Sequence, residues 1–136
     1  MTATSAFDIV EPIFQTVVDR VGAERWIQPD VLRQQPAGVR MLLSTRAVDG
    51  LVANSGWVAI RVENQLGLLP LAAEGYDLLG LESHAEIARR ASGLSYDADD
   101  DEPAGWSEQD EEWFELPDAD EARAAYIRAH PEEFRL

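Results

Sequence analysis

Acidic side chains are concentrated in one segment near the C-terminus. Between Asp97 and Glu121 the chain places thirteen carboxylates in twenty-five residues and no Lys or Arg. Residues 97–136 hold 15 acids and 3 bases (net −12), whereas residues 1–96 hold 11 acids and 8 bases (net −3). The negative field therefore belongs to the C-terminal third. Within that segment, we expect apolar residues such as Trp113 and Phe114 to face a core, so only part of the acidic row can point one way.

The remaining composition is that of a globular protein. The chain has 136 residues, of which 46% are hydrophobic, enough for one domain (residues 1–136) with a real core. It has no cysteine, which excludes disulfides and thiolate metal sites and fits a reducing compartment. The first twelve residues show no secretory signal, and no stretch approaches the ~18 apolar residues that span a bilayer. We therefore expect a soluble, cytoplasmic protein without a membrane partner.

Apolar residues recur at helical spacing, and no segment shows the alternation of a strand. The predicted helices cover residues 10–21, 36–52, 57–64, 70–79, 82–93, 107–115 and 117–129. Pro12 suits a first turn, Gly22 a C-cap, and Ser107 with Asp110 a capping box. An acidic linker with Pro and Gly is expected at about residues 95–106. The sequence thus predicts an all-α single domain of six to eight short helices.

Several segments carry a family resemblance. They are Asn54-Ser55-Gly56-Trp57, Asn64-Gln65-Leu66-Gly67, Leu78-Leu79-Gly80-Leu81, residues 85–91 and the tail His130-Pro131-Glu132-Glu133-Phe134. Together they resemble the bacterial DNA-mimic family of small acidic all-helical proteins, whose signature contains Asn-Gly-Gly-Phe and whose members end in a similar tail. In this chain Ser55 replaces the first glycine of the signature, and Trp57 replaces the phenylalanine.

The resemblance implies an acidic helical protein that forms dimers and occupies the DNA-binding face of a transcription regulator. The one-sided negative charge itself favours a basic protein as partner and disfavours nucleic acid, and binding by occlusion would need no cofactor and no catalysis. The residues expected to bind this partner are the acids of the C-terminal segment: Asp97, Asp99, Asp100, Asp101, Glu102, Glu108, Asp110, Glu111, Glu112, Glu115, Asp118, Asp120 and Glu121.

The charge density supports this interpretation. Eight of these acids fall between Glu108 and Glu121, a length of roughly 21 Å if the stretch is helical. The spacing, about one charge per 2.6 Å, is of the same order as the one per ~1.7 Å of duplex DNA. Two different roles for the charge stay open. The acids could only keep the protein soluble, or the protein could be an immunity- or antitoxin-like inhibitor of a basic effector such as a nuclease.

A calcium site or an enzyme is a further alternative. Asp97, Asp99, Asp101 and Glu108 have the spacing of EF-hand ligands, but Glu102 stands where that loop needs glycine, and Pro103 follows. The two histidines show no metal-ligand pattern: His84 is expected at a solvent position in a first helical turn, and His130 at a helix end. No nucleophile elbow or phosphate-binding glycine loop is present. The sequence therefore predicts neither a metal site nor catalytic residues.

Overall fold

Helices form every regular element of the chain that the structure describes. The computed structural model describes residues 5–55, 67–93 and 106–134, with the backbone alone at residues 54–55, 92–93 and 106–110. The elements are α1 (Ala6–Val21), α2 (Pro29–Leu32), α3 (Ala37–Ser55), α5 (Leu68–Leu78), α6 (Glu82–Gly93), α7 (Trp106–Glu115), α8 (Asp120–Ala129) and the 3-10 helix η1 (Pro131–Phe134). With seven α-helices and no strand in these residues, the all-α prediction is confirmed.

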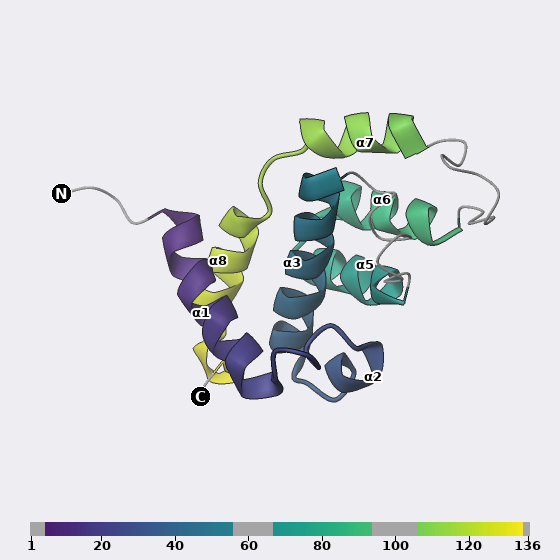
Figure 1. The fold of residues 1–136 in the computed structure, drawn as a ribbon. Coiled ribbons are helices and arrows are strands. Elements are labelled where there is room, and N and C mark those ends of the chain that lie inside the picture. The colour runs from purple at the N-terminus through teal and green to yellow at the C-terminus, as the bar shows by residue number, and fades with distance from the viewer. Residues whose placement is uncertain (1–4, 56–66, 94–105, 135–136) are drawn as a thin grey trace.

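The helices are arranged around α3, which stands at the centre of the molecule (Figure 1). α1 and α8 pack side by side on one flank of α3, while α5 packs on the other flank and in turn contacts α6. α7 contacts α6 and lies beyond one end of α3, so the acidic C-terminal segment crosses from the α6 flank to the α8 flank. No helix in the described ranges is long and apolar enough to cross a membrane.

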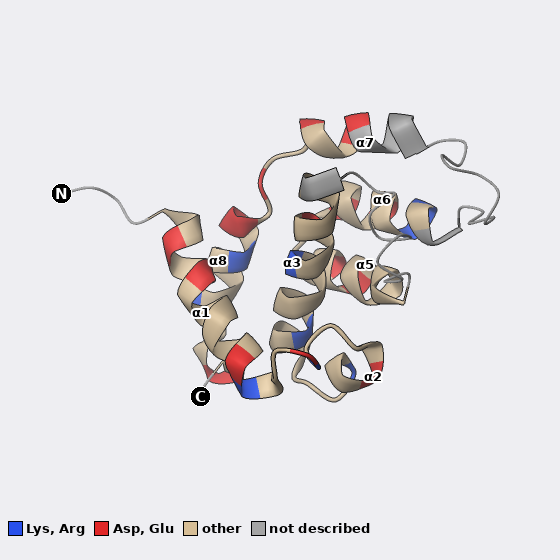
Figure 2. Cartoon of the chain, viewed as in Figure 1, with Lys and Arg blue, Asp and Glu red and all other residues tan. Residues whose placement is uncertain are grey.

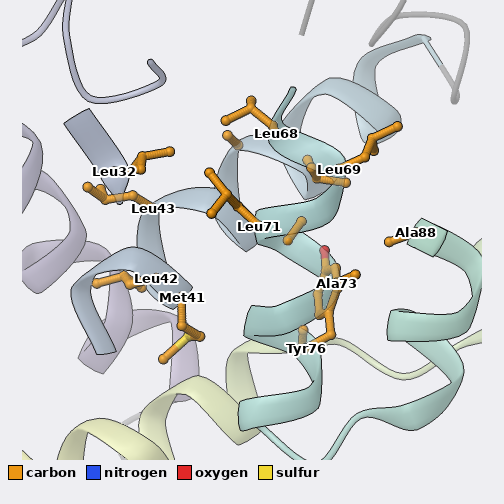
Figure 3. Packing of buried hydrophobic residues seen from close by; sticks show 14 of the residues in the cluster. Leu32, Met41, Leu42, Leu43, Leu68, Leu69, Leu71, Ala73, Tyr76 and Ala88 are labelled. Carbon is orange, nitrogen blue, oxygen red and sulfur yellow. The ribbon is translucent and has the colours of Figure 1, made fainter. Parts of the chain in front are cut away.

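The central position of α3 requires apolar residues on most of its circumference. Its buried side chains include Met41, Leu42, Leu43, Val48 and Val52, the pattern of a helix covered on all sides. Figure 3 shows leucines of α2, α3 and α5 gathered in one cluster. Each such side chain stabilises the fold by about 1.5–3 kcal/mol relative to an exposed one.

Helix ends follow their local signals in most places. The Ser5 hydroxyl accepts a hydrogen bond from the backbone N–H of Asp8 at 3.2 Å and so caps α1. α1 ends at Gly22 with φ 118°, as its sequence position predicts. The position predicted for Pro12 is wrong, because the Ser5 cap starts α1 at Ala6 and leaves Pro12 inside the helix.

Two further expectations fail in the acidic segment. α7 begins at Trp106, so Ser107 lies inside the helix rather than at its N-cap. Phe114 does not face the core: the periodicity that buries Trp113 turns its neighbour outward, and Phe114 is 60% exposed. The predicted helix over residues 57–64 and nearly all of the predicted linker over residues 95–106 lie outside the described residues.

The C-terminal tail is fastened to the start of α3. Glu133 accepts a hydrogen bond from the Gly38 backbone N–H at 2.9 Å and one from the Tyr126 hydroxyl at 2.6 Å. The Tyr126 bond lowers the pKa of Glu133, while burial and Glu133 together raise the pKa of Tyr126 to about 12. A Cβ at position 38 would lie 2.8 Å from the Tyr126 ring and 2.9 Å from the ring of Phe134. The tail therefore requires glycine at this position of α3.

This contact can be tested by comparing two glycines of the same helix. Gly38→Ala should lower the free energy of unfolding by about 1–3 kcal/mol, because the methyl group overpacks the tail. Gly50→Ala should raise it by about 0.5–1 kcal/mol, since nothing lies within 4 Å of its added Cβ and alanine is the better helix former. Urea unfolding measures both; equal effects would show that the tail does not pack as described.

Candidate protein-binding surface

Exposed carboxylates line α7 and its connection to α8 (Figure 2). We call the exposed set the acidic surface: Glu111, Glu112, Glu115, Asp118 and Glu121. Glu111 and Glu115 stand one helical turn apart on α7, Asp118 lies in the connection that follows, and Glu121 lies in the first turn of α8. Of the other predicted residues, Glu108 and Asp110 lie on α7 with only their backbone described, and Asp97, Asp99, Asp100, Asp101 and Glu102 lie outside the described residues.

Asp120 does not belong to this surface. It was expected among the partner-binding acids, but it is only 6% exposed. Its Oδ1 accepts a hydrogen bond from Arg123 Nη1 at 2.8 Å, and the Arg46 guanidinium lies alongside. The sequence could not reveal this, because the run of acids around Asp120 looks uniform while the cations that draw it inside come from its own helix and from α3.

Phe114 lies within the acidic surface. Its neighbours Glu111 and Glu115 are exposed, as Phe114 itself is. An exposed aromatic ring among like charges resembles the apolar anchors of protein interfaces more than a solvated helix face.

A groove of about 360 Å³ runs between α6 and α7. Its lining combines the buried Ile87 and half-buried Leu116 with the carboxylates of Glu86, Glu112 and Glu115. Arg90 also lines the groove and pairs with Glu86 and Glu112. The lining therefore suits a long basic side chain whose methylene groups contact the apolar residues while its charged end meets Glu115.

Aromatic packing and one ion pair hold α7 against the body. The Trp113 ring meets Tyr76 edge-on with centroids 5.5 Å apart and His84 with centroids 5.1 Å apart. On the outside, Arg90 donates a hydrogen bond to Glu112, which lowers the pKa of that carboxyl. α7 is therefore attached through its Trp113 side, and its acidic surface remains open.

His84 is a structural residue that sequence reasoning placed in solvent. It is 5% exposed, packs against Tyr76 and Trp113, and its Nε2 lies 3.2 Å from the Pro117 carbonyl oxygen. A neutral ring with its proton on Nε2 donates this hydrogen bond to residues 116–119, which we call the joint between α7 and α8. Burial lowers the pKa of His84, although the Pro117 carbonyl opposes the shift. No local signal marks His84, because the rings that cover it come from α5 and α7.

Beneath the joint lies a buried cation. Arg123 of α8 is 1% exposed; its Nε donates to Thr45 Oγ1 at 3.0 Å, its Nη1 to Asp120, and its Nη2 to Asp49. Tyr76 also donates to Asp49, and burial with that carboxylate raises the pKa of Tyr76 well above its ordinary value. Burial disfavours the guanidinium charge, but Asp49, Tyr76 and Asp120 together outweigh it, and the pKa of Arg123 is raised.

A second arginine extends this network to α1. Arg46 Nη1 donates to Glu11 Oε2 at 2.7 Å, and the guanidinium carbon lies 4.9 Å from the centre of the Phe14 ring. Its Nη2 donates to Asp120 Oδ2 at 3.4 Å, while its Nε lies 3.3 Å from Asp120 Oδ1 without the geometry of a hydrogen bond. The network thus joins α1, α3, α5 and α8 next to the acidic surface.

One group of potential metal ligands occurs in the described residues. His130, Glu132 and Glu133 bring one ligand atom each within 4.8 Å of one another. The sequence showed no metal-ligand pattern at His130, but η1 brings these two glutamates close to its ring. The proposed calcium loop from Asp97 to Glu108 lies almost wholly outside the described residues.

The chain matches a known protein family. The sequence model of the DMP19-like protein family matches residues 33–130, well over half of the chain. The chain belongs to the DMP19-like protein family. No curated protein and no solved structure matches it. The matched range contains α3, α5, α6, α7 and α8, and hence the acidic surface and Arg123 with its direct partners, but not the α1 part of the network.

The Arg123 network gives a first test of the site. Arg123→Met should lower the free energy of unfolding by about 3–5 kcal/mol, because it leaves Asp49 and Asp120 without their buried partner. Arg89→Met removes the exposed Arg89–Asp77 pair and should cost at most about 1 kcal/mol. Chemical unfolding of both variants gives the comparison, and losses of similar size would contradict the importance of the buried cation.

His84 gives a second test through pH. The unfolded chain binds a proton to His84 near pH 6.5, whereas the folded protein does so only at lower pH. Stability should therefore fall as the pH is lowered through about 6.5, and this loss should end below the folded pKa. His84→Gln keeps an N–H donor for Pro117, so urea unfolding at pH 7.5 and 5.0 should show a smaller pH loss in the variant. Equal losses would show that His84 is not the titrating group.

Proposed function

We propose that this protein is a binding module that imitates the charge of DNA and occupies the DNA-binding surface of a basic protein. The observation that carries the proposal is the acidic surface. Glu111, Glu115 and Glu121 are exposed and make no ion pair within the described residues. The arginines that do form ion pairs there contact other acids: Arg46, Arg89, Arg90 and Arg123. The family match supports the same role.

The proposed mechanism is occlusion without chemistry. A field of one sign attracts a surface of opposite sign and repels nucleic acid and anionic membranes. Close contact would add charge-assisted hydrogen bonds from Arg or Lys side chains of the partner to the carboxylates. The groove between α6 and α7 and the exposed Phe114 would supply apolar contact around those bonds. A partner bound in this way could not bind DNA through the same basic surface.

We further propose, from the resemblance to DNA-mimic proteins, that the partner is a transcription regulator and that the module works as a homodimer in the cytoplasm. A basic effector nuclease would satisfy the same charge pattern. Identifying the captured protein separates the two, since a nuclease partner would instead make this chain an immunity-like inhibitor.

The central experiment removes charge from the acidic surface. The variant Glu111→Gln, Glu115→Gln, Asp118→Asn and Glu121→Gln should bind the partner at least tenfold more weakly at 0.1 M NaCl, where the Debye length is ~10 Å. Binding of the unmodified protein should itself weaken steeply towards 1 M NaCl. The partner would be captured from native lysate at low salt and the affinity then measured with purified components.

A matched variant controls for net charge. Asp19→Asn, Glu24→Gln, Asp30→Asn and Glu74→Gln removes four exposed acids from α1, α2, α5 and the α1–α2 connection. It should retain most of the affinity, because its charge change is equal and its position is different. Equal weakening by the two variants would show a net-charge effect, and binding that persists unchanged in 1 M NaCl would refute the mimicry mechanism.

A further inference from the structure

Three side chains of the C-terminal tail converge on one point outside the acidic surface. His130 ends α8, and Glu132 and Glu133 lie on η1 immediately after it. His130 Nδ1 is 3.7 Å from Glu132 Oε1 and 3.7 Å from Glu133 Oε2. One nitrogen therefore faces two carboxylate oxygens at the same distance.

These distances are too long for hydrogen bonds, which join nitrogen and oxygen at about 2.7–3.2 Å. They are close to the separation of two ligands on one ion. With metal–ligand bonds of about 2.0–2.2 Å, two tetrahedral ligands lie roughly 3.3–3.6 Å apart. All three ligand atoms lie within 4.8 Å of one another, so rotation of the exposed Glu132 side chain would bring them onto a common ion.

The surroundings hold two of the three side chains in place. Glu133 is fixed by hydrogen bonds from the Tyr126 hydroxyl and the Gly38 backbone N–H, and each of its oxygens keeps a second lone pair. The His130 ring packs on the Tyr126 ring with centroids 4.4 Å apart. Such fixing of a ligand by outer hydrogen bonds is typical of metal sites, where it limits the reorganisation needed on binding.

We propose that His130, Glu132 and Glu133 form a binding site for a divalent transition-metal ion of the zinc class. Imidazole favours zinc-class ions over Ca²⁺ and Mg²⁺, which prefer oxygen ligands alone. Three protein ligands leave one position of a tetrahedral ion for water. The ion would join the end of α8 to η1, and through Glu133 to the start of α3, so the folded protein should gain stability on binding it.

The test is calorimetric titration of the full-length, chelator-treated protein with ZnCl₂ in a buffer that does not bind metal. The buffer contains 150 mM NaCl and 1 mM CaCl₂, so that the acidic segment is screened and its weak cation sites are filled. We expect one zinc ion per chain with a Kd in the micromolar range or tighter. A rise in Tm should accompany saturation, because the ion binds only the folded site.

Two substitutions decide whether the ion occupies the proposed site. His130→Gln and Glu132→Gln should each weaken zinc binding at least tenfold and remove the rise in Tm. Glu74→Gln on α5, which makes the same charge change as Glu132→Gln at an exposed position outside both sites, should leave the zinc affinity unchanged. Glu132 is exposed and lies outside the contact with Gly38, so its variant keeps the test valid if His130→Gln folds poorly.

Unfolding without metal completes the test. Wild type and Glu132→Gln should then unfold alike, so that loss of binding cannot be ascribed to loss of fold. Absence of zinc binding would overturn the proposal. Binding that both substitutions leave unchanged would also overturn it, and would indicate an adventitious ion only, bound elsewhere on the chain.

Discussion

A single buried cation determines how the helices of this protein meet. The Arg123 guanidinium can be buried only where carboxylates and hydroxyls satisfy it, since an unpaired charge in the interior is costly. Its partners come from its own helix and from α3: Asp120, Asp49 and Thr45. Tyr76 of α5 reaches the same Asp49 from the other flank. The positions of α3, α5 and α8 are therefore fixed relative to one another through one group.

The acidic surface depends on this arrangement. α8 starts at the residue that binds Arg123, so the joint between α7 and α8 is placed by the buried network and by the His84 contact with Pro117. Trp113 then directs one side of α7 onto Tyr76 and His84, and the opposite side carries acids into solvent. Arg46 of α3 and Arg123 of α8 form their ion pairs with acids of α1, α3 and α8. Glu111 and Glu115 therefore have no ion-pair partner among the described side chains.

The tail is held by equally specific contacts at the other end of α8. Glu133 caps the first turn of α3 from ninety-five residues away, and the absence of a side chain at Gly38 lets the Tyr126 and Phe134 rings approach. The residues that fasten the tail also orient His130. A contact that stabilises the fold thus creates the geometry from which a metal site is inferred.

Local sequence signals were sufficient to locate the helices, but they did not show which face of each helix is buried. The spacing of apolar residues and the stops at Gly22, Gly80 and Pro131 predicted most helices near their observed positions. The same reasoning placed Phe114 inside and His84 outside, and both were wrong. Each error concerns a residue whose environment is set by how helices pack. Periodicity shows that two faces exist, but which neighbour covers a given face depends on tertiary contacts.

The sequence by itself determined that the protein is helical, that its negative charge lies in the C-terminal third, and which family it resembles, because propensity, spacing and composition are properties of neighbouring residues. Only the tertiary structure decided that Asp120 is drawn inside by Arg123 and Arg46, whereas Glu111, Glu115 and Asp118 remain outside. These carboxylates are chemically equivalent along the chain. What separates them is the presence or absence of a guanidinium within a few ångströms, and that is fixed only when α1, α3 and α8 pack together.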